Sequence, residues 1–381
     1  MERLQTVNPE RIEWCCEDRD VSLADLAADT NIALPTLEKT MAGEPGVTFG
    51  QLRRIAEYFG RGVLFFLEQG PATAELVHTP QFRTLANQKI GLSPKLKLLI
   101  ERVEKSREIY LTLQEDLQED AAPRFAPPEL PRDVVRAAAA IRRWLGLGPE
   151  NDFTSYRAAL QAKGILVFRS NGYNGKWQIP KDSPVLGFAL YDDRCPVIVV
   201  RKERFETRQS FTLMHELGHL VLHRASSIDD ASDFHSNEGH EREANMFAGH
   251  LLVPAEFLLE INDQRRPRGV EEYDGWLRPQ SEKWTVSTEV ILRRLLDSGR
   301  LTADKYNEYR AWRDRQVYAE DGQGNRQYRH REPVHIFGDG YVRTVLDSLS
   351  GKRITLARAS TYLDNLKISD LHQLERFYAR I

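Results

Sequence analysis

The residues best suited to chemistry are two histidines and a glutamate in the segment His215-Glu-Leu-Gly-His219. On an α-helix, residues four positions apart project from nearly the same side, because successive residues turn by about 100°. Two neutral imidazoles at that spacing can bind one side of a tetrahedral zinc ion. Glu216, one step around the helix, is then placed to take a proton from water on the metal. His223 continues the spacing by four, and we expect it to support the ligands or pack beside them.

The residues around this motif predict a buried helix. Apolar side chains flank it on almost every side: Phe211, Leu213, Met214, Leu217, Leu220, Val221 and Leu222. Burying two imidazoles and a carboxylate without partners is unfavourable, and a bound metal removes that penalty. The alternative, a surface helix with ordinary histidines, fits these flanks poorly.

A catalytic zinc site needs a third protein ligand and an open fourth position for water. The segment His240–Pro254 predicts a second helix, on which Glu241 and Asn245 share a face with small apolar residues. Such a face allows close approach by the first helix. We therefore predict Glu241 as the third ligand and Asn245 as a hydrogen-bond partner that orients a ligand. Glu243 points to the other side, where we expect it to be mainly solvated.

The elements that must position these residues are of two kinds. Alternating apolar residues predict strands over 164–168, 185–190 and 196–200, with a hairpin turn between the last two. Helices are predicted over 94–117, 131–145 and 153–162, and the first seventy residues read as a bundle of short helices. Helix starts in that bundle are marked by Asn8, Ser22 and Thr48, and a last apolar helix is predicted over 63–67.

The motif His215-Glu-Leu-Gly-His219, followed by Glu241-x-x-Ala-Asn-x-Phe-Ala-x-x-Leu-Leu-x-Pro254, resembles the ImmA/IrrE-like family of bacterial zinc metallopeptidases. In that family the two histidines and the downstream glutamate bind zinc, and the glutamate between the histidines is the catalytic base. The resemblance therefore implies a Zn²⁺ cofactor with these roles for His215, His219, Glu241 and Glu216. It also implies a protein substrate, a helix-turn-helix repressor or an antitoxin-like partner.

The first part of the chain resembles an XRE-type helix-turn-helix domain, through Ser22-Leu-Ala-Asp-Leu-Ala27 and Phe49-Gly-Gln-Leu-Arg-Arg-Ile-Ala56. The layout resembles long regulators that carry both modules in one chain. We therefore expect an α+β protein with an N-terminal all-α helix-turn-helix bundle, a zincin-like metallopeptidase core with a small β-sheet, and a mostly helical C-terminal extension. The expected domains are the helix-turn-helix domain at 1–70, a connector with a long amphipathic helix at 71–130, the peptidase domain at 131–300 and the extension at 301–381.

The charge of the first domain leaves its partner open. Residues 1–70 hold seven basic and twelve acidic side chains, a balance of −5. Phosphate contacts supply much of the affinity for DNA, and this surface can neutralise few phosphates. Thr36, Lys39 and Thr40 on the expected recognition helix are the candidates for contact with DNA or with a protein partner. DNA binding and a docking or dimerisation role are both open, as is a homodimer.

Composition excludes several classes of protein. A net charge of −3 excludes a uniformly basic coat, and no apolar run is long enough to cross a bilayer. Three cysteines, Cys15, Cys16 and Cys195, do not make a disulfide framework. The first residues lack the features of a secretion signal. We therefore expect a cytoplasmic protein without a membrane partner.

These observations favour a regulatory zinc metalloendopeptidase that controls transcription or a stress, phage or toxin–antitoxin response. One alternative is a non-catalytic XRE-type antitoxin or autorepressor whose metal site is structural. Another is a self-processing regulator that is cut near the proline-rich linker at 121–128.

Overall fold

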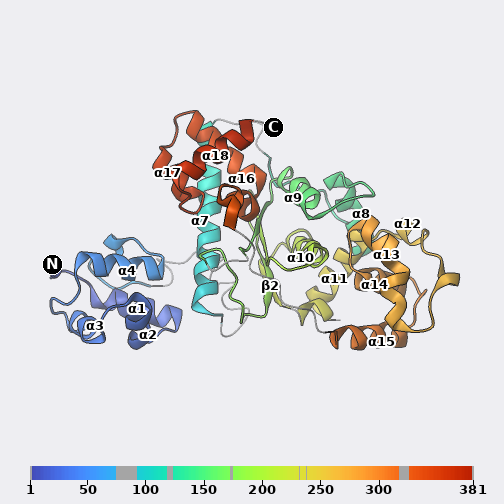
Figure 1. The fold of residues 1–381 in the computed structure, drawn as a ribbon, viewed down its shortest axis with the longest axis horizontal. Coiled ribbons are helices and arrows are strands. Elements are labelled where there is room, and N and C mark those ends of the chain that lie inside the picture. The colour runs from blue at the N-terminus through green and yellow to red at the C-terminus, as the bar shows by residue number, and fades with distance from the viewer. Residues whose placement is uncertain are drawn as a thin grey trace. The chain divides into compact units, whose positions relative to one another are not determined.

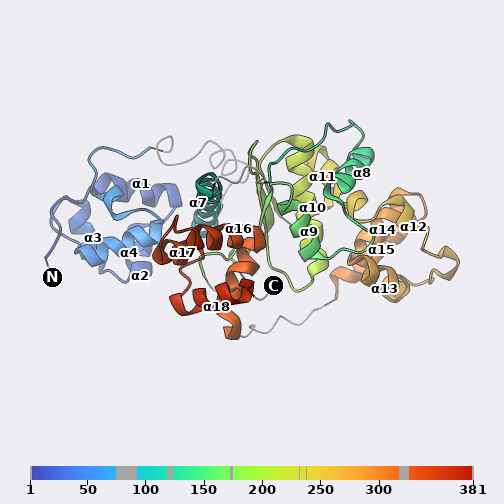
Figure 2. The same ribbon diagram turned by 90° about the horizontal axis from the view of Figure 1, so that it is seen from above.

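The computed structural model describes residues 2–73, 92–117, 123–171, 175–230, 232–236, 238–316 and 326–379 (Figures 1 and 2). The chain forms two compact units, Met1–Arg102 and Val103–Ile381. The division falls inside the long helix α7 (Pro94–Leu117), which has the predicted bounds. Residues 74–91 of the predicted connector and the first two residues of the linker at 121–128 lie outside the described residues. The predicted boundaries at 70, 130 and 300 stay predictions.

The first unit is the predicted helical bundle. Its helices are α1 (Pro9–Arg19), α2 (Leu23–Thr30), α3 (Leu34–Met41) and α4 (Phe49–Phe59), followed by the short 3₁₀ helix η1 (Val63–Phe66) where a last helix was predicted. The side chains of Asn8, Ser22 and Thr48 accept hydrogen bonds from the first turns of their helices, as the sequence predicts. One apolar face from each helix meets in a common core, which explains why such short helices are stable together.

The second unit contains a four-stranded sheet among its described residues. Its strands are β1 (Leu166–Arg169), β2 (Val185–Leu190), β3 (Val197–Val200) and β4 (Ser227–Asp230), in the order β1-β3-β2-β4. β1 and β3 are parallel, whereas β2 is antiparallel to both β3 and β4. The first three strands and the β2–β3 hairpin were predicted. β4 was not, because four residues with two aspartates have low strand propensity and pair only through contact with β2.

The two faces of the sheet are covered by different helices. Side chains alternate between the faces, so that Val167 and Ile198 join the core shared with α10 (Glu206–Gly218), whereas Phe168 points to the other face. There Phe168 packs against Phe337 of α16 (Glu332–Ser350), with ring centroids 5.5 Å apart. Figures 1 and 2 show α10 and α16 on opposite sides of the sheet. The face of the sheet that carries Val167 and Ile198 therefore packs against α10.

The remaining elements are mostly helical. They are α8 (Val134–Leu145), α9 (Phe153–Gln161), η2 (His219–His223), η3 (Asp233–His235), α11 (Gly239–Leu252), α12 (Ala255–Leu258), η4 (Asp263–Arg265), η5 (Val270–Glu272), α13 (Tyr273–Trp284), α14 (Thr288–Asp297), α15 (Ala303–Asp314), η6 (Arg326–Arg331), α17 (Leu356–Tyr362) and α18 (Ile368–Ala379). The α+β class and the mostly helical C-terminal part are confirmed. In the described part of the chain, no helix combines the length and the apolar character that crossing a bilayer needs.

Candidate metal centre

Helix α10 carries the paired histidines into the core. His215 and Glu216 are fully buried, and His219 is 3% exposed. The predicted burial of this helix is therefore confirmed. At His219 the α-helix widens into η2, a π-helical turn that ends at His223. Single π-helical turns are frequent at functional sites, because they change the direction of a side chain without ending the helix.

Helix α11 approaches α10 closely at one point. A Cβ atom on Gly218 would lie 3.2 Å from the Cα atom of Ala244, so the absence of a side chain at Gly218 permits the contact. Ala244 and Ala248 are fully buried, which confirms the predicted small face of the second helix. This close packing brings Glu241, in the first turn of α11, to the histidines of α10.

The structure places one nitrogen from each histidine and one oxygen of Glu241 at mutual distances suited to a metal. The Nε2 atoms of His215 and His219 are 3.2 Å apart. Glu241 Oε2 lies 3.2 Å from the first nitrogen and 3.5 Å from the second. Ligand atoms around a tetrahedral zinc are separated by roughly 3.3 Å, given metal–ligand bonds of about 2.0–2.2 Å. The three atoms therefore outline one face of such a tetrahedron.

Asn245 contacts the His215 ring on the side away from Glu241 and His219. Its amide nitrogen donates to the backbone carbonyls of Asp233 and Ser236, so its Oδ1 atom is left to accept. That oxygen lies 3.0 Å from His215 Nδ1, which must then carry the proton. The lone pair of His215 Nε2 consequently faces Glu241 and His219. The arrangement matches the role predicted for Asn245, whose effect on a metal stays a prediction.

A similar chain of contacts supports His219. His223 Nδ1 lies 3.1 Å from His219 Nδ1, and His223 Nε2 lies 3.0 Å from Glu243 Oε2. Burial lowers the pKa of His223 to about 4, against the opposing effect of Glu243. A neutral His223 that donates to Glu243 can accept the Nδ1 proton of His219, which leaves His219 Nε2 free for a metal. Glu243, predicted to be mainly solvated, is half-exposed but contacts His223, and His240 stacks on the His223 ring at 4.0 Å.

Glu216 lies beside the three candidate ligands in a closed environment. Its Oε2 atom accepts a hydrogen bond of 2.7 Å from Ser227 of β4. Burial, and next the carboxylate of Asp229, raise the pKa of Glu216 well above the ordinary range, while the Ser227 hydroxyl acts in the opposite direction. Glu216 is thus a buried carboxyl group whose surroundings raise its pKa.

The sheet makes room for Glu216 through a glycine. A Cβ atom on Gly187 of β2 would lie 2.7 Å from Glu216 Oε1 and 2.6 Å from Thr212 Cγ2. Strand β2 also changes register against β4 between Val185 and Gly187, which sets Gly187 opposite Asp229. Bulges and glycines of this kind are typical where a strand passes a site. The isolated glycine in the strand 185–190 was the available signal in the sequence.

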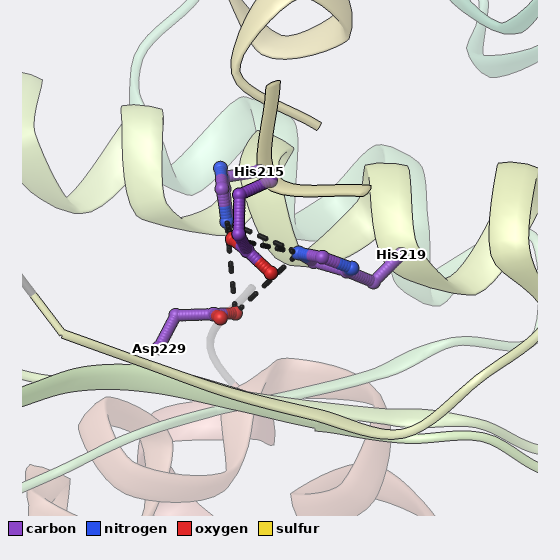
Figure 3. A group of neighbouring side chains, drawn as sticks. His215, His219 and Asp229 are labelled. Atoms are coloured by element: carbon purple, nitrogen blue, oxygen red, sulfur yellow. Dashed lines mark hydrogen bonds and ion pairs between the residues drawn. The ribbon is translucent and has the colours of Figure 1, made fainter. Parts of the chain in front are cut away.

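Asp229 is the residue that the sequence did not reveal. Its side chain extends from β4 toward the imidazoles (Figure 3). Asp229 Oδ2 lies 3.6 Å from His215 Nε2 and 3.7 Å from His219 Nε2. Burial raises the pKa of Asp229, while the charges of His215 and His219 lower it.

The chemistry of this cluster fits a zinc ion. The oxygens Asp229 Oδ2 and Glu241 Oε2 are buried and lack a hydrogen-bond partner among the described residues. Buried carboxylate oxygens are normally paired, so both atoms require an explanation. Two imidazole nitrogens and carboxylate oxygens within 4.8 Å of one another are a set of donors that zinc accepts.

In the first unit, the three residues predicted to contact DNA or a partner differ in their exposure to solvent. Lys39 is exposed on α3 and Thr36 is half-buried. Thr40 is 2% exposed, and its hydroxyl accepts a hydrogen bond from the Val47 N–H and donates to the Thr36 carbonyl. The prediction that Thr40 contacts DNA or a partner is therefore wrong, because Thr40 holds the loop after α3 onto the helix.

Most basic side chains of residues 1–70 have partners within the first unit. Five of the seven in residues 1–70 donate to backbone carbonyls or pair with carboxylates there: Arg3, Arg11, Arg19, Arg54 and Arg61. Arg53 is exposed beside Glu57, at 3.8 Å. Few cations are thus available to a phosphate backbone.

Two known families match this chain, one in each of its two compact units. Residues 162–296 match the family model of the IrrE N-terminal-like domain, peptidase M78. Residues 11–61 match that of the Cro/C1-type helix-turn-helix DNA-binding domain. The first match spans β1 to α14 and includes His215, Glu216, His219, Asp229 and Glu241. A search of curated proteins gave no match.

Proposed function

Because an IrrE N-terminal-like peptidase domain follows a Cro/C1-type helix-turn-helix domain in this chain, we propose that the protein is a regulatory zinc metalloendopeptidase. The observation that carries the proposal is the triangle of His215 Nε2, His219 Nε2 and Glu241 Oε2, with Glu216 buried beside it. Its substrate would be a partner repressor or an antitoxin-like protein. Cleavage would then control transcription or a stress, phage or toxin–antitoxin response.

The residues around the triangle can perform peptide hydrolysis. Zinc held by His215, His219 and Glu241 would supply a Lewis acid that polarises the scissile carbonyl. Glu216 would take a proton from the attacking water and deliver it to the leaving amine. The raised pKa of Glu216 suits this exchange, because it makes the carboxylate a stronger base toward the attacking water.

The test is cleavage by the zinc-loaded full chain of the helix-turn-helix or antitoxin-like proteins encoded beside its gene. We expect Glu216→Gln to reduce cleavage by at least about 100-fold while zinc content stays the same. Glu206→Gln is a matched control, because Glu206 starts the same helix and its side chain is 53% exposed, near Arg169. It should cleave like the wild type. Cleavage by Glu216→Gln at the wild-type rate would refute the mechanism.

A second candidate is a non-catalytic regulator whose metal is structural. It is favoured by Asp229, which lies against the same imidazoles as Glu241, because structural zinc sites are closed by protein ligands. This candidate predicts that Glu216→Gln retains promoter binding or toxin neutralisation and that no form of the protein cleaves its partner.

A further inference from the structure

The carboxylate of Asp229 lies where the fourth ligand of a tetrahedral metal would be. We propose that Asp229 is that ligand, so that the resting metal centre is closed and becomes a peptidase only when Asp229 moves away. The proposal rests on the proposed function for the presence of the metal. It adds a fourth donor and a latent state to the three-ligand site.

The distances from Asp229 Oδ2 to the two histidine nitrogens support its place as the fourth ligand. Asp229 Oδ2 is 3.6 and 3.7 Å from the two Nε2 atoms, only slightly more than the roughly 3.3 Å of a tetrahedral zinc site. All four candidate donor atoms lie within 4.8 Å of one another. Figure 3 shows the carboxylate extending to the imidazoles from the strand rather than from either ligand-bearing helix. The oxygen is buried and has no hydrogen-bond partner among the described residues, as expected of an atom that serves a metal.

The sheet holds Asp229 in this place. Asp229 is 2% exposed and stands opposite Gly187 in the β2–β4 register, where no side chain separates it from α10. The end of β4 is tied to η3, because the Asp230 N–H donates to Asp233 Oδ2 at 2.8 Å. Asn245 donates in turn to the Asp233 carbonyl. These contacts hold the backbone at the end of β4, from which the Asp229 side chain extends.

A fourth coordination position filled by Asp229 has a consequence for peptide hydrolysis. With Asp229 as the fourth ligand, a substrate carbonyl would have no access to the metal. Displacement of Asp229 would open the fourth position to a substrate carbonyl. The binding of a protein substrate against the β4–η3 segment is a suitable trigger, since Asp230 and Asp233 are only partly buried there.

The test uses the full chain and two variants, Asp229→Ala and the nearly isosteric Asp229→Asn. The first measurement is zinc affinity by competition with a chelator. Loss of a partner outside the ligand set lowers metal affinity by about 10–100-fold, so loss of a ligand should lower it by more than about 100-fold. The second is the visible spectrum of the cobalt(II)-substituted protein titrated with acetohydroxamate. We expect at least about tenfold tighter acetohydroxamate binding to Asp229→Ala than to the wild type.

The control is Asp230→Asn, the same change on the next residue, whose carboxylate accepts from Ser232. It should match the wild type in both measurements, and circular dichroism should show that all variants fold. Unchanged zinc affinity in Asp229→Asn, or equal acetohydroxamate binding by the wild type and Asp229→Ala, would overturn the proposal. Both readouts are independent of hydrolysis. A closed wild-type site that opens in Asp229→Ala, with no cleavage by either, would support Asp229 as the fourth ligand and refute the peptidase function.

Discussion

Gly187, which lies beneath α10, offers a test of the geometry around Glu216. Substituting Gly187 by alanine would place a Cβ atom 2.7 Å from Glu216 Oε1, about 0.7 Å inside ordinary contact, and 3.1 Å from the Val199 carbonyl oxygen. The backbone oxygen belongs to the central strand β3 and cannot move easily. The strain must therefore be relieved by movement of Glu216 and of Thr212, which the same atom would approach to 2.6 Å.

Overpacking of this kind destabilises a core by about 1–3 kcal/mol. A shift of about 1 Å in a catalytic group lowers the rate by up to about 100-fold. We therefore expect Gly187→Ala to lose about 1–3 kcal/mol in its free energy of unfolding and about 10- to 100-fold in partner cleavage. Urea unfolding followed by circular dichroism measures the first effect, and a cleavage time course measures the second.

Gly275→Ala is the matched control. Gly275 lies in α13, a Cβ atom there meets nothing within 4 Å, and alanine in an exposed helix should stabilise by about 0.5–1 kcal/mol. If Gly187→Ala were as stable and as active as Gly275→Ala, the contact between the sheet and Glu216 would not exist as described.

Three further predictions concern other contacts. Asn245→Ala removes the acceptor that fixes the His215 ring, so zinc affinity measured with a chelator should fall by about 10–100-fold, and an unchanged affinity would exclude this role. Thr40→Val leaves the buried Val47 N–H without its acceptor, so thermal melting should show the first unit destabilised by about 1–3 kcal/mol; wild-type melting would contradict the assignment. If residues 1–70 bind DNA, the two exposed cations Lys39 and Arg53 predict a shallow slope of about −2 for log K against log salt, whereas a slope near −6 would show that other basic residues reach the phosphates.

Local sequence was sufficient for the features that depend on neighbours along the chain. The spacing of His215 and His219 and the face shared by Glu241 and Asn245 follow from helical periodicity, which holds wherever the helix is placed. Helix starts at Asn8 and Ser22 follow from side-chain caps that act within one turn. Strands with alternating or continuous apolar residues were recognised for the same reason.

Only the tertiary structure decided how these pieces face one another. The register change in β2 sets Gly187 against Asp229 and brings both under α10, and residues that lie far apart in the chain make that contact. β4 itself is recognisable only through its partner strand, so Asp229 and Ser227 had no local signal. Thr40 shows the reverse case, in which a polar residue on a helix face is buried by the loop that follows. Periodicity identifies the face of an element, but which segment covers that face depends on packing between distant parts of the chain.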